Sequence, residues 1–526
     1  MSDSNIGARR KRNIKDHLFI IHGIINSVVR GDEDCVDIQI YDLEKAFDTL
    51  WLIDSLNDIF DTLPKDKRND ELSLLYETNR NTQMAIKTAV GMTDRVSITD
   101  TVQQGGTWGS MLCANSIDTI GKKCRDRNIH CYYYKKKARI LPLGFIDDLN
   151  GIARCGQESL ELNNFLNAQI ELKKLRFHVP DVNGKTKCHK LHIGKSLKNC
   201  AALKVHGTIM PEVSEETYIG DILSKDGKNT KNIENRISKG IGIINNIFNL
   251  LENIVFGNHY FEIALLLRES MLINGIMTNA EIWYNLTKCE MEKFEYLDRL
   301  FFRRLLSVAE TTPKEAYYLE LGCIPLNILL KGRRVKYLHS ILKRDKSGML
   351  YNVFITQWNY PCKGDWTEQV KIDLEDLNIP CSFSFIESKS KESFKTLVKA
   401  KTKEFSLTYL KNLQLKHSKL SQLFYHDIKL QQYFTNPELT VSQKQMLFRC
   451  RVRMENFGEN FRGGKSEVLC RLCNSHLDNL EMSFKCAEIR KKVKVVGNPR
   501  DILEDRINNE TTHTITKILK AREQLQ

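Results

Sequence analysis

The sequence predicts an α+β protein, because residues 1–225 mix short strands with helices and a long helical region follows. Residues 36–42, VDIQIYD, alternate apolar and polar side chains with the period of two that is typical of a strand. Residues 44–60 take the helical period instead, and residues 228–345 keep that period over a much longer stretch. The fold class therefore rests on where each period occurs along the chain.

The other predicted elements follow in chain order. An amphipathic helix near the amino terminus is indicated by apolar residues at helical spacing, namely Leu18, Ile21, Ile25 and Val28. Residues 157–176 are predicted to be helical, and 187–194 and 203–210 to contain short strands. Within the long helical region, a single apolar stripe consists of Ile233, Ile237, Ile241, Ile244 and Phe248. Residues 346–440 are irregular and then helical.

Charge and cysteine content indicate the environment and the partner. Lysine and arginine number 79 against 65 acidic residues, a net charge of +14. Such an excess favours a polyanionic partner such as nucleic acid, although a well-solvated basic surface also fits it. The 15 cysteines are odd in number and scattered, which is typical of reduced intracellular thiols. No apolar run approaches the roughly 18 residues of a membrane span, so we expect a soluble protein of the nucleus or cytoplasm without a membrane partner.

Two adjacent carboxylates interrupt the apolar stretch LPLGFIDDLNGIA, residues 141–153. Burying Asp147 and Asp148 side by side costs several kcal/mol unless a cation compensates. If this stretch is a hairpin, both lie at its tight turn, and Asp42 ends the other clear strand. Mg²⁺ prefers carboxylate ligands together with substrate phosphates, so these three residues are candidate ligands. The alternative is that the Asp-Asp pair simply forms a turn.

Three motifs in order resemble motifs A, B and C of reverse transcriptases: DLEKAFD (42–48), VQQGGTWGS (102–110) and GFIDDL (144–149). Three further stretches resemble the region that follows motif D in non-LTR (LINE-type) retrotransposons: YIGDILSKDGKNTKNIENRISKG (218–240), ELGCIPL (320–326) and RRVKYLHSIL (333–342). The resemblance covers about residues 8–490. It implies an RNA-directed DNA polymerase, a nucleotidyltransferase of a transposable element.

The resemblance also implies the domain organisation. Residues 1–225 would form partial fingers and a right-hand polymerase palm, an antiparallel sheet with packed helices. Residues 228–345 would form a helical thumb, 346–440 a connector, and 441–526 a carboxy-terminal region that contains a cluster of cysteines.

Catalytic and metal-binding roles carry over to matching positions. Asp42 and Asp147 would hold two Mg²⁺ ions, or Mn²⁺, with Asp148 beside them, because two metals can clamp the attacking and leaving oxygens of a phosphoryl transfer. Lys187 would lie near the departing pyrophosphate. Lys185 competes for that role, and a solvated strand lysine is the alternative reading of Lys187.

The resemblance assigns substrate contacts as well. Phe47 matches the bulky residue that excludes a ribose 2′-OH, although it could equally pack the helix after the strand. Gln104 and Gly105 match the pair that lies along the dNTP and the template. In the predicted thumb, Lys231, Arg236 and Lys239 could follow a phosphate backbone or form a solvated helix face. The implied partners are an RNA template and a DNA primer, and the sequence leaves open whether a separate endonuclease is a further partner.

A cysteine cluster near the carboxy terminus resembles the Cys-Cys-His-Cys zinc knuckle of such elements. Cys470 and Cys473 have good Zn²⁺ spacing, and Cys486 follows. The histidine expected four residues before Cys486 is Met482 here, so His476 would have to supply the fourth ligand.

The sequence departs from the family pattern in two places. Gly109-Ser110 replaces the usual Ser-Pro after motif B. Compared with the family, the sequence starts shortly before motif A, without upstream fingers strands, so we expect either a 5′-truncated copy of an element or an incomplete gene sequence. The sequence is therefore consistent with two alternative functions. The first is RNA-templated DNA synthesis, and the second is a catalytically inactive remnant that only binds nucleic acid.

Overall fold

The computed structural model describes residues 4–525 apart from 8, 10–11, 63–69, 81–82, 98–107, 128–130, 181–184, 196–201, 254–258, 285, 418–419, 459–467 and 504–508. The chain is an α+β protein, as predicted, and divides into two compact units. The first comprises residues 1–231, 282–286 and 340–371. The second comprises 232–281, 287–339 and 372–526. Residues 346–371 of the predicted connector thus belong to the first unit.

A five-stranded sheet organises the first unit, in the order β13-β10-β1-β9-β8. All neighbours are antiparallel except β10 and β13. The strands are β1 (Cys35–Tyr41), β8 (Leu143–Phe145), β9 (Asp148–Ala153), β10 (His189–Gly194) and β13 (Glu212–Val213). Strand β1 therefore lies at the centre, with β9 on one side and β10 on the other.

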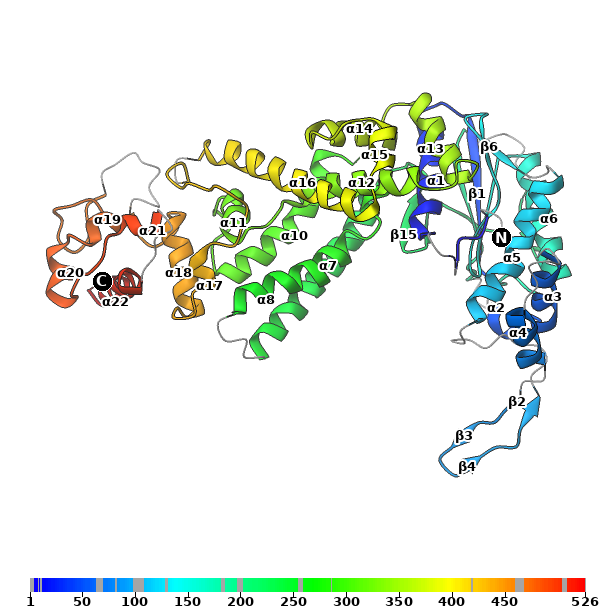
Figure 1. Cartoon of the computed structure of the whole chain (residues 1–526), viewed down its shortest axis with the longest axis horizontal. Coiled ribbons are helices and arrows are strands. Elements are labelled where there is room, and N and C mark those ends of the chain that lie inside the picture. The colour runs from blue at the N-terminus through cyan, green and yellow to red at the C-terminus, as the bar shows by residue number, and fades with distance from the viewer. Residues whose placement is uncertain are drawn as a thin grey trace. The chain divides into compact units, whose positions relative to one another are not determined.

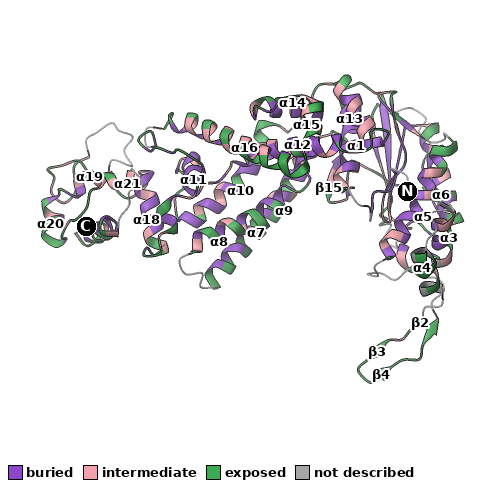
Figure 2. Cartoon of the chain, in the orientation of Figure 1, coloured by how far each residue is buried: buried purple, intermediate pink, exposed green. Residues whose placement is uncertain are grey.

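Helices cover both faces of this sheet. Helices α1 (Ile14–Val29) and α13 (Met349–Asn359) lie on one side, and α5 (Gly109–Arg127) and α6 (Gln157–Leu172) lie on the other (Figure 1). The central strand β1 is buried over its whole length, and Figure 2 shows it in the colour of buried residues. The alternation in residues 36–42 predicted one polar face, but Asp37 and Gln39 are buried too. Partners make this possible: Asp37 accepts from His192 at 2.7 Å, and Gln39 donates to Ser159.

The segment predicted as one helix over 44–60 is two helices, α2 (Ala46–Thr49) and α3 (Leu52–Thr62), with α4 (Asp70–Arg80) following. The remaining strands of the first unit form two-stranded ribbons. They are β2 (Gln83–Met84) with β5 (Val96–Ser97), β3 (Lys87–Thr88) with β4 (Gly91–Met92), β6 (Tyr132–Tyr134) with β7 (Ala138–Ile140), β11 (Lys204–Val205) with β12 (Thr208–Ile209), and β14 (Glu215–Tyr218) with β15 (Asp221–Ser224).

The regular elements that the structure describes in the second unit are helices, joined by turns and irregular segments. Its first helices are α7 (Thr230–Asn253), α8 (Tyr260–Leu267), a π-helical turn (Arg268–Ile273), α9 (Asn274–Ile276), α10 (Lys288–Leu306), α11 (Lys314–Leu321) and α12 (Leu326–Leu342). The later helices are α14 (Trp366–Asp376), α15 (Phe383–Ser388), α16 (Lys391–Gln414), α17 (Gln432–Thr435), α18 (Val441–Arg451), α19 (Leu480–Ser483), α20 (Ala487–Lys492), α21 (Arg500–Leu503) and α22 (Asn509–Leu525). The first residues of α7 and α14 and the last of α12 belong to the first unit.

The buried face of α7 differs from the predicted stripe at Ile237, which is half-buried, and at Ile241. Ile233, Ile244 and Phe248 are buried as predicted, but Ile241 is 40% exposed. Gly240 takes its place in the contact, because a Cβ there would lie 2.6 Å from a methyl carbon of Leu297. A larger residue at this position would force the Leu297 side chain to move, so glycine favours the close approach of the two helices.

A buried ion pair joins distant helices of the second unit. The guanidinium of Arg451 donates to the carboxylate of Glu320 at 2.9 Å, and neither side chain is exposed. The hydroxyl of Tyr433 donates to the same carboxylate at 2.8 Å, and the hydroxyl of Tyr425 is a further donor. Removing any member of such a network leaves a buried charged or polar group without its partner.

The cysteines are free at all described positions except one pair. Cys35, at the start of β1, is joined by a disulfide to Cys155, just after β9. This corrects the prediction of reduced thiols at these two positions. Because β1 pairs with β9, the two residues lie at the same end of this strand pair, and their Cα atoms are 6.1 Å apart. Among the described residues, none of the helices combines the length and apolarity that crossing a membrane requires.

Candidate active site

Strand pairing brings the three predicted carboxylates to one edge of the sheet. Strands β8 and β9 form the predicted hairpin, whose two-residue turn consists of Ile146 and Asp147, and Asp148 is the first residue of β9. Tyr41, the last residue of β1, pairs with Leu149 of β9. Because this ladder is antiparallel, the next residue of β1, Asp42, follows in register with Asp148.

The turn of this hairpin is strained and is held by the amino-terminal segment. Ile146 has φ of +60°, a conformation that β-branched residues rarely adopt. The side-chain amide of Asn5 donates to the carbonyl of Ile146 at 3.3 Å, and its oxygen accepts from the Ile146 N–H at 3.4 Å. Gly7 leaves room, because a Cβ there would lie 2.5 Å from the Ile146 nitrogen. Asn5 thus fixes the backbone next to Asp147.

The backbone of Asp42 is anchored and its side chain is paired. Its carbonyl accepts from the N–H of His178 at 2.8 Å and from the thiol of Cys188. The ammonium of Lys187 lies 3.1 Å from its carboxylate, although the Lys187 side chain is 65% exposed. Lys187 thus lies beside one of the predicted carboxylates. Lys185 is exposed.

The electrostatics of the site follow from partial burial and mutual repulsion. Burial raises the pKa of Asp147, and the charge of Asp42 raises it further. Burial together with the charges of Asp147 and Asp42 raises the pKa of Asp148 to about 6, while Lys187 opposes the shift. A carboxyl whose pKa in the folded state exceeds its unfolded value of about 3.9 destabilises the fold at neutral pH. This destabilisation is lost as the pH falls from the folded-state pKa to the unfolded-state pKa.

The donor set suits a hard divalent cation. Ionised carboxylates are acceptor-only ligands, and a cation would relieve the repulsion that raises the two pKa values. In the part of the chain that the structure describes, the oxygens of the three carboxylates do not, as a set, lie within 4.8 Å of one another. The residues fit a divalent ion in chemistry, and Asp42, Asp147 and Asp148 would hold it.

The three residues predicted to contact the nucleotide and the template are Phe47, Gln104 and Gly105. Phe47 is half-buried and packs against the apolar core of the first unit, which includes Tyr41 and Leu43. Phe47 therefore contributes to core packing. Its predicted contact with a nucleotide stays a prediction. Gln104 and Gly105 lie outside the described residues.

The predicted phosphate-binding residues of α7 do not share one environment. Lys231 and Lys239 are exposed. Arg236 is buried and donates to the carbonyl of Thr278 at 3.3 Å. The prediction that all three face away from the core is therefore corrected for Arg236, because this residue falls on the buried face of the helix between Ile233 and Gly240.

Three sulfurs of the carboxy-terminal cysteine cluster lie together. The Sγ atoms of Cys470, Cys473 and Cys486 are all within 4.8 Å of one another, and those of Cys470 and Cys486 are 3.8 Å apart. The side chain of His476 does not belong to this group, although its carbonyl accepts from the N–H of Cys470. Burial raises the pKa of Cys486 to about 11. Burial also acts on Cys473, but hydrogen bonds outweigh it and lower that pKa.

Removing a cysteine is expected to affect metal content more than removing His476. Thiolates are the ligands that Zn²⁺ prefers, and three are already gathered here. Elemental analysis of the purified chain should show bound Zn²⁺ decreasing in Cys470→Ser and unchanged in His476→Ala. Stoichiometric Zn²⁺ that disappears in His476→Ala would instead identify the histidine as the fourth ligand.

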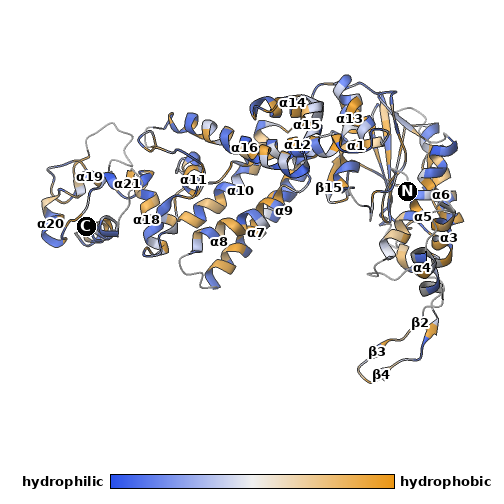
Figure 3. Ribbon diagram, in the orientation of Figure 1, coloured by the Kyte–Doolittle hydropathy of each residue, from blue (hydrophilic) through white to orange (hydrophobic). Residues whose placement is uncertain are grey.

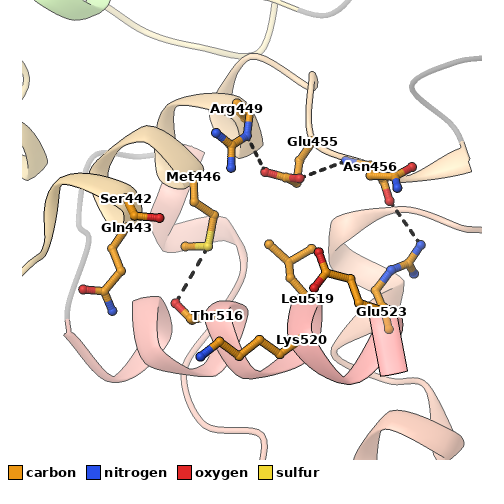
Figure 4. A pocket seen from close by; sticks show the side chains of 11 residues that line it. Ser442, Gln443, Met446, Arg449, Glu455, Asn456, Thr516, Leu519, Lys520 and Glu523 are labelled. Atoms are coloured by element: carbon orange, nitrogen blue, oxygen red, sulfur yellow. Dashed lines mark hydrogen bonds and ion pairs between the residues drawn. The ribbon is translucent and has the colours of Figure 1, made fainter. Parts of the chain in front are cut away.

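A separate cavity lies between α18 and α22 (Figure 4). It has a volume of about 230 Å³ and includes Met446, Leu519 and Lys520 in its lining. Two of its arginines are already paired: Arg449 with Glu455 at 2.8 Å, and Arg522 with Asp478 at 2.7 Å. None of the residues predicted to be functional lines this cavity.

Sequence reasoning missed Asn5, the residue that holds the strained turn. It lies 141 residues before Ile146, and no local pattern links the two positions. Comparison with known proteins adds no assignment: no protein-family model and no curated protein matches the chain.

Proposed function

We propose that the chain is an RNA-directed DNA polymerase of a non-LTR retrotransposon, which adds dNTPs to the 3′-OH of a primer. In this proposal the five-stranded sheet with α5 and α6 is the palm, and the helices from α7 to α12 contain the thumb. The observation that carries it is the pairing of β1 with β9, which puts Asp42 across from Asp148 and beside the Ile146-Asp147 turn. The three sequence motifs and the net positive charge support it.

Two divalent ions, when bound, would activate the primer hydroxyl and stabilise the charge that develops on the transferring α-phosphoryl group. Asp42 and Asp147 supply ionised oxygens for this purpose, and Asp148 adds a third negative charge. Asn5 and the β1–β9 ladder keep these side chains at fixed positions. Lys187 places a positive charge beside them, where it would neutralise and protonate the leaving pyrophosphate.

Primer extension tests the proposal. The purified chain is incubated with poly(rA)–oligo(dT), dTTP and Mg²⁺, with EDTA as the control. We expect extension that requires both the template and the divalent ion. Binding of the primer–template without extension, in Mg²⁺ and in Mn²⁺, would favour the inactive remnant instead.

Phe47→Val is expected to increase incorporation of ribonucleotides relative to deoxyribonucleotides. A smaller side chain would leave room for the 2′-OH if Phe47 borders the nucleotide. The ratio of extension with UTP to extension with dTTP measures this effect. Because Phe47 also packs against the core, a matched Phe165→Val variant, whose side chain contacts the same core from α6, controls for loss of stability. An unchanged ratio with activity retained would leave Phe47 with packing alone.

Extension is expected to need more Mg²⁺ at lower pH. Protons compete with the ion for Asp148, whose pKa is raised to about 6, and for Asp147, whose pKa is also raised. Between pH 8 and pH 6 the Mg²⁺ concentration for half-maximal extension should rise at least about twofold. A half-maximal concentration that stays constant over this interval would show that these carboxyls do not bind the ion.

A further inference from the structure

One face of α16 carries a row of lysines that no predicted site includes. Residues 389–403 contain six lysines and a single acidic residue, Glu392. Within the helix, Lys391, Lys395 and Lys399 follow one another at intervals of four residues, and all three are exposed. Each interval advances about 6 Å along the helix axis and rotates only about 40°. The three ammonium groups, hereafter the lysine row, therefore form a line on one side of the helix.

Packing fixes the direction in which the lysine row faces. Phe394, Val398 and Thr402 form the buried face of α16 alongside it. The ring of Phe394 stacks on that of His339 at 4.7 Å, and a Cβ at Gly332 would lie 2.8 Å from the hydroxyl oxygen of Thr402. Figures 2 and 3 show exposed and hydrophilic turns along the outer side of this helix. The helix cannot rotate without losing these contacts, so the row stays at the surface.

The lysine row differs from its neighbours in lacking carboxylate partners. Lys401 pairs with Glu404 at 3.0 Å, and Lys403 pairs with Asp427 at 2.8 Å. Among the residues that the structure describes, no ion pair joins a carboxylate to any of the three lysines of the row. Like charges four residues apart destabilise a helix by about 0.2–0.5 kcal/mol per pair. A polyanion whose charges recur at short, regular intervals would offset this repulsion.

We propose that the lysine row binds the phosphodiester backbone of a nucleic-acid strand. A backbone presents one negative charge per nucleotide, and lysines on flexible stems can each reach one phosphate without reading sequence. The same chemistry is present in RNA and in DNA. The net charge of +14 fits a long anionic partner. The proposal does not depend on polymerisation, so it stands or fails separately from the proposed function.

The salt dependence of binding tests the lysine row. The full chain and the triple variant K391Q/K395Q/K399Q bind a fluorescent single strand of RNA or of DNA over a range of KCl concentrations. Each lost phosphate contact lowers the slope of log affinity against log salt by about 0.7 for single strands, so we expect a decrease of about 2. Glutamine keeps a high helix propensity, so α16 should remain folded. If the triple variant does not fold, K395E alone should lower the slope by about 1.

A charge-matched variant, K195Q/K225Q/K228Q, provides the control, because these three lysines are exposed residues of the first unit. It should change the slope by less than half as much as the triple variant. Equal changes in the two variants would overturn the proposal, since net charge alone would then explain binding. Weakening of both RNA and DNA binding supports the shared backbone chemistry. Loss of binding to phosphatidylserine vesicles with nucleic-acid binding retained would overturn the proposal in favour of a membrane surface.

Discussion

Asp147→Asn is expected to abolish primer extension and to leave primer–template binding unchanged. The substitution keeps the shape of the side chain but removes the negative charge with which a divalent ion would be held. Stabilisation of the transferring phosphoryl group accounts for much of the barrier reduction in such reactions, so the rate should fall at least about 10³-fold. Single-nucleotide extension at saturating primer–template measures the rate.

Binding provides the control for this variant. Phosphate contacts come from lysine and arginine, so the affinity of Asp147→Asn and its salt slope should equal those of the unsubstituted chain. Asp48→Asn, on α2 shortly after Asp42, removes the same charge at an exposed site and should extend normally. Equal extension by Asp147→Asn and the unsubstituted chain would refute the catalytic assignment.

Arg451→Met should destabilise the second unit by about 3–5 kcal/mol, the largest effect on stability that we expect. It leaves the buried carboxylate of Glu320 without its cationic partner, although the hydroxyls of Tyr425 and Tyr433 remain. Urea unfolding followed by far-UV circular dichroism measures the change. All five tryptophans lie in the first unit, so their fluorescence reports that unit separately.

Two further variants distinguish the reason for this destabilisation. Glu320→Gln/Arg451→Met removes both charges and should recover some of the lost stability. Lys401→Met breaks an exposed pair with Glu404 and should change stability by less than about 0.5 kcal/mol. A loss below about 1 kcal/mol in Arg451→Met would show that the buried pair contributes little.

The hairpin of the candidate site was predictable from sequence because its cause is local. Two apolar arms flank a pair of carboxylates, and the structure places the turn one residue earlier than the Asp147-Asp148 pair. The pairing of β1 with β9 could not be predicted from the alternation of apolar and polar residues, because this pattern does not indicate which strands are neighbours. The order of the motifs supplied that expectation.

Other features depend on contacts that local patterns do not encode. The alternation of β1 predicted a polar face, but His192 and Ser159, far along the chain, satisfy Asp37 and Gln39. Arg236 has the spacing of the buried face of α7, so a stricter helical wheel would have placed it inside. The absence of His476 from the sulfur cluster depends on chain geometry between Cys473 and Cys486, which ligand spacing alone does not determine.

Binding of Mn²⁺ tests most directly the central claim, that Asp42, Asp147 and Asp148 form a divalent-metal site. Electron paramagnetic resonance reports free Mn²⁺ as the ion is titrated into the chain with primer–template and a non-hydrolysable dNTP analogue. We expect saturable binding that weakens at least tenfold in Asp147→Asn and in Asp42→Asn, and that is unchanged in Asp48→Asn. Mn²⁺ binding of equal strength in all four proteins, or none above that of the analogue alone, would contradict this claim.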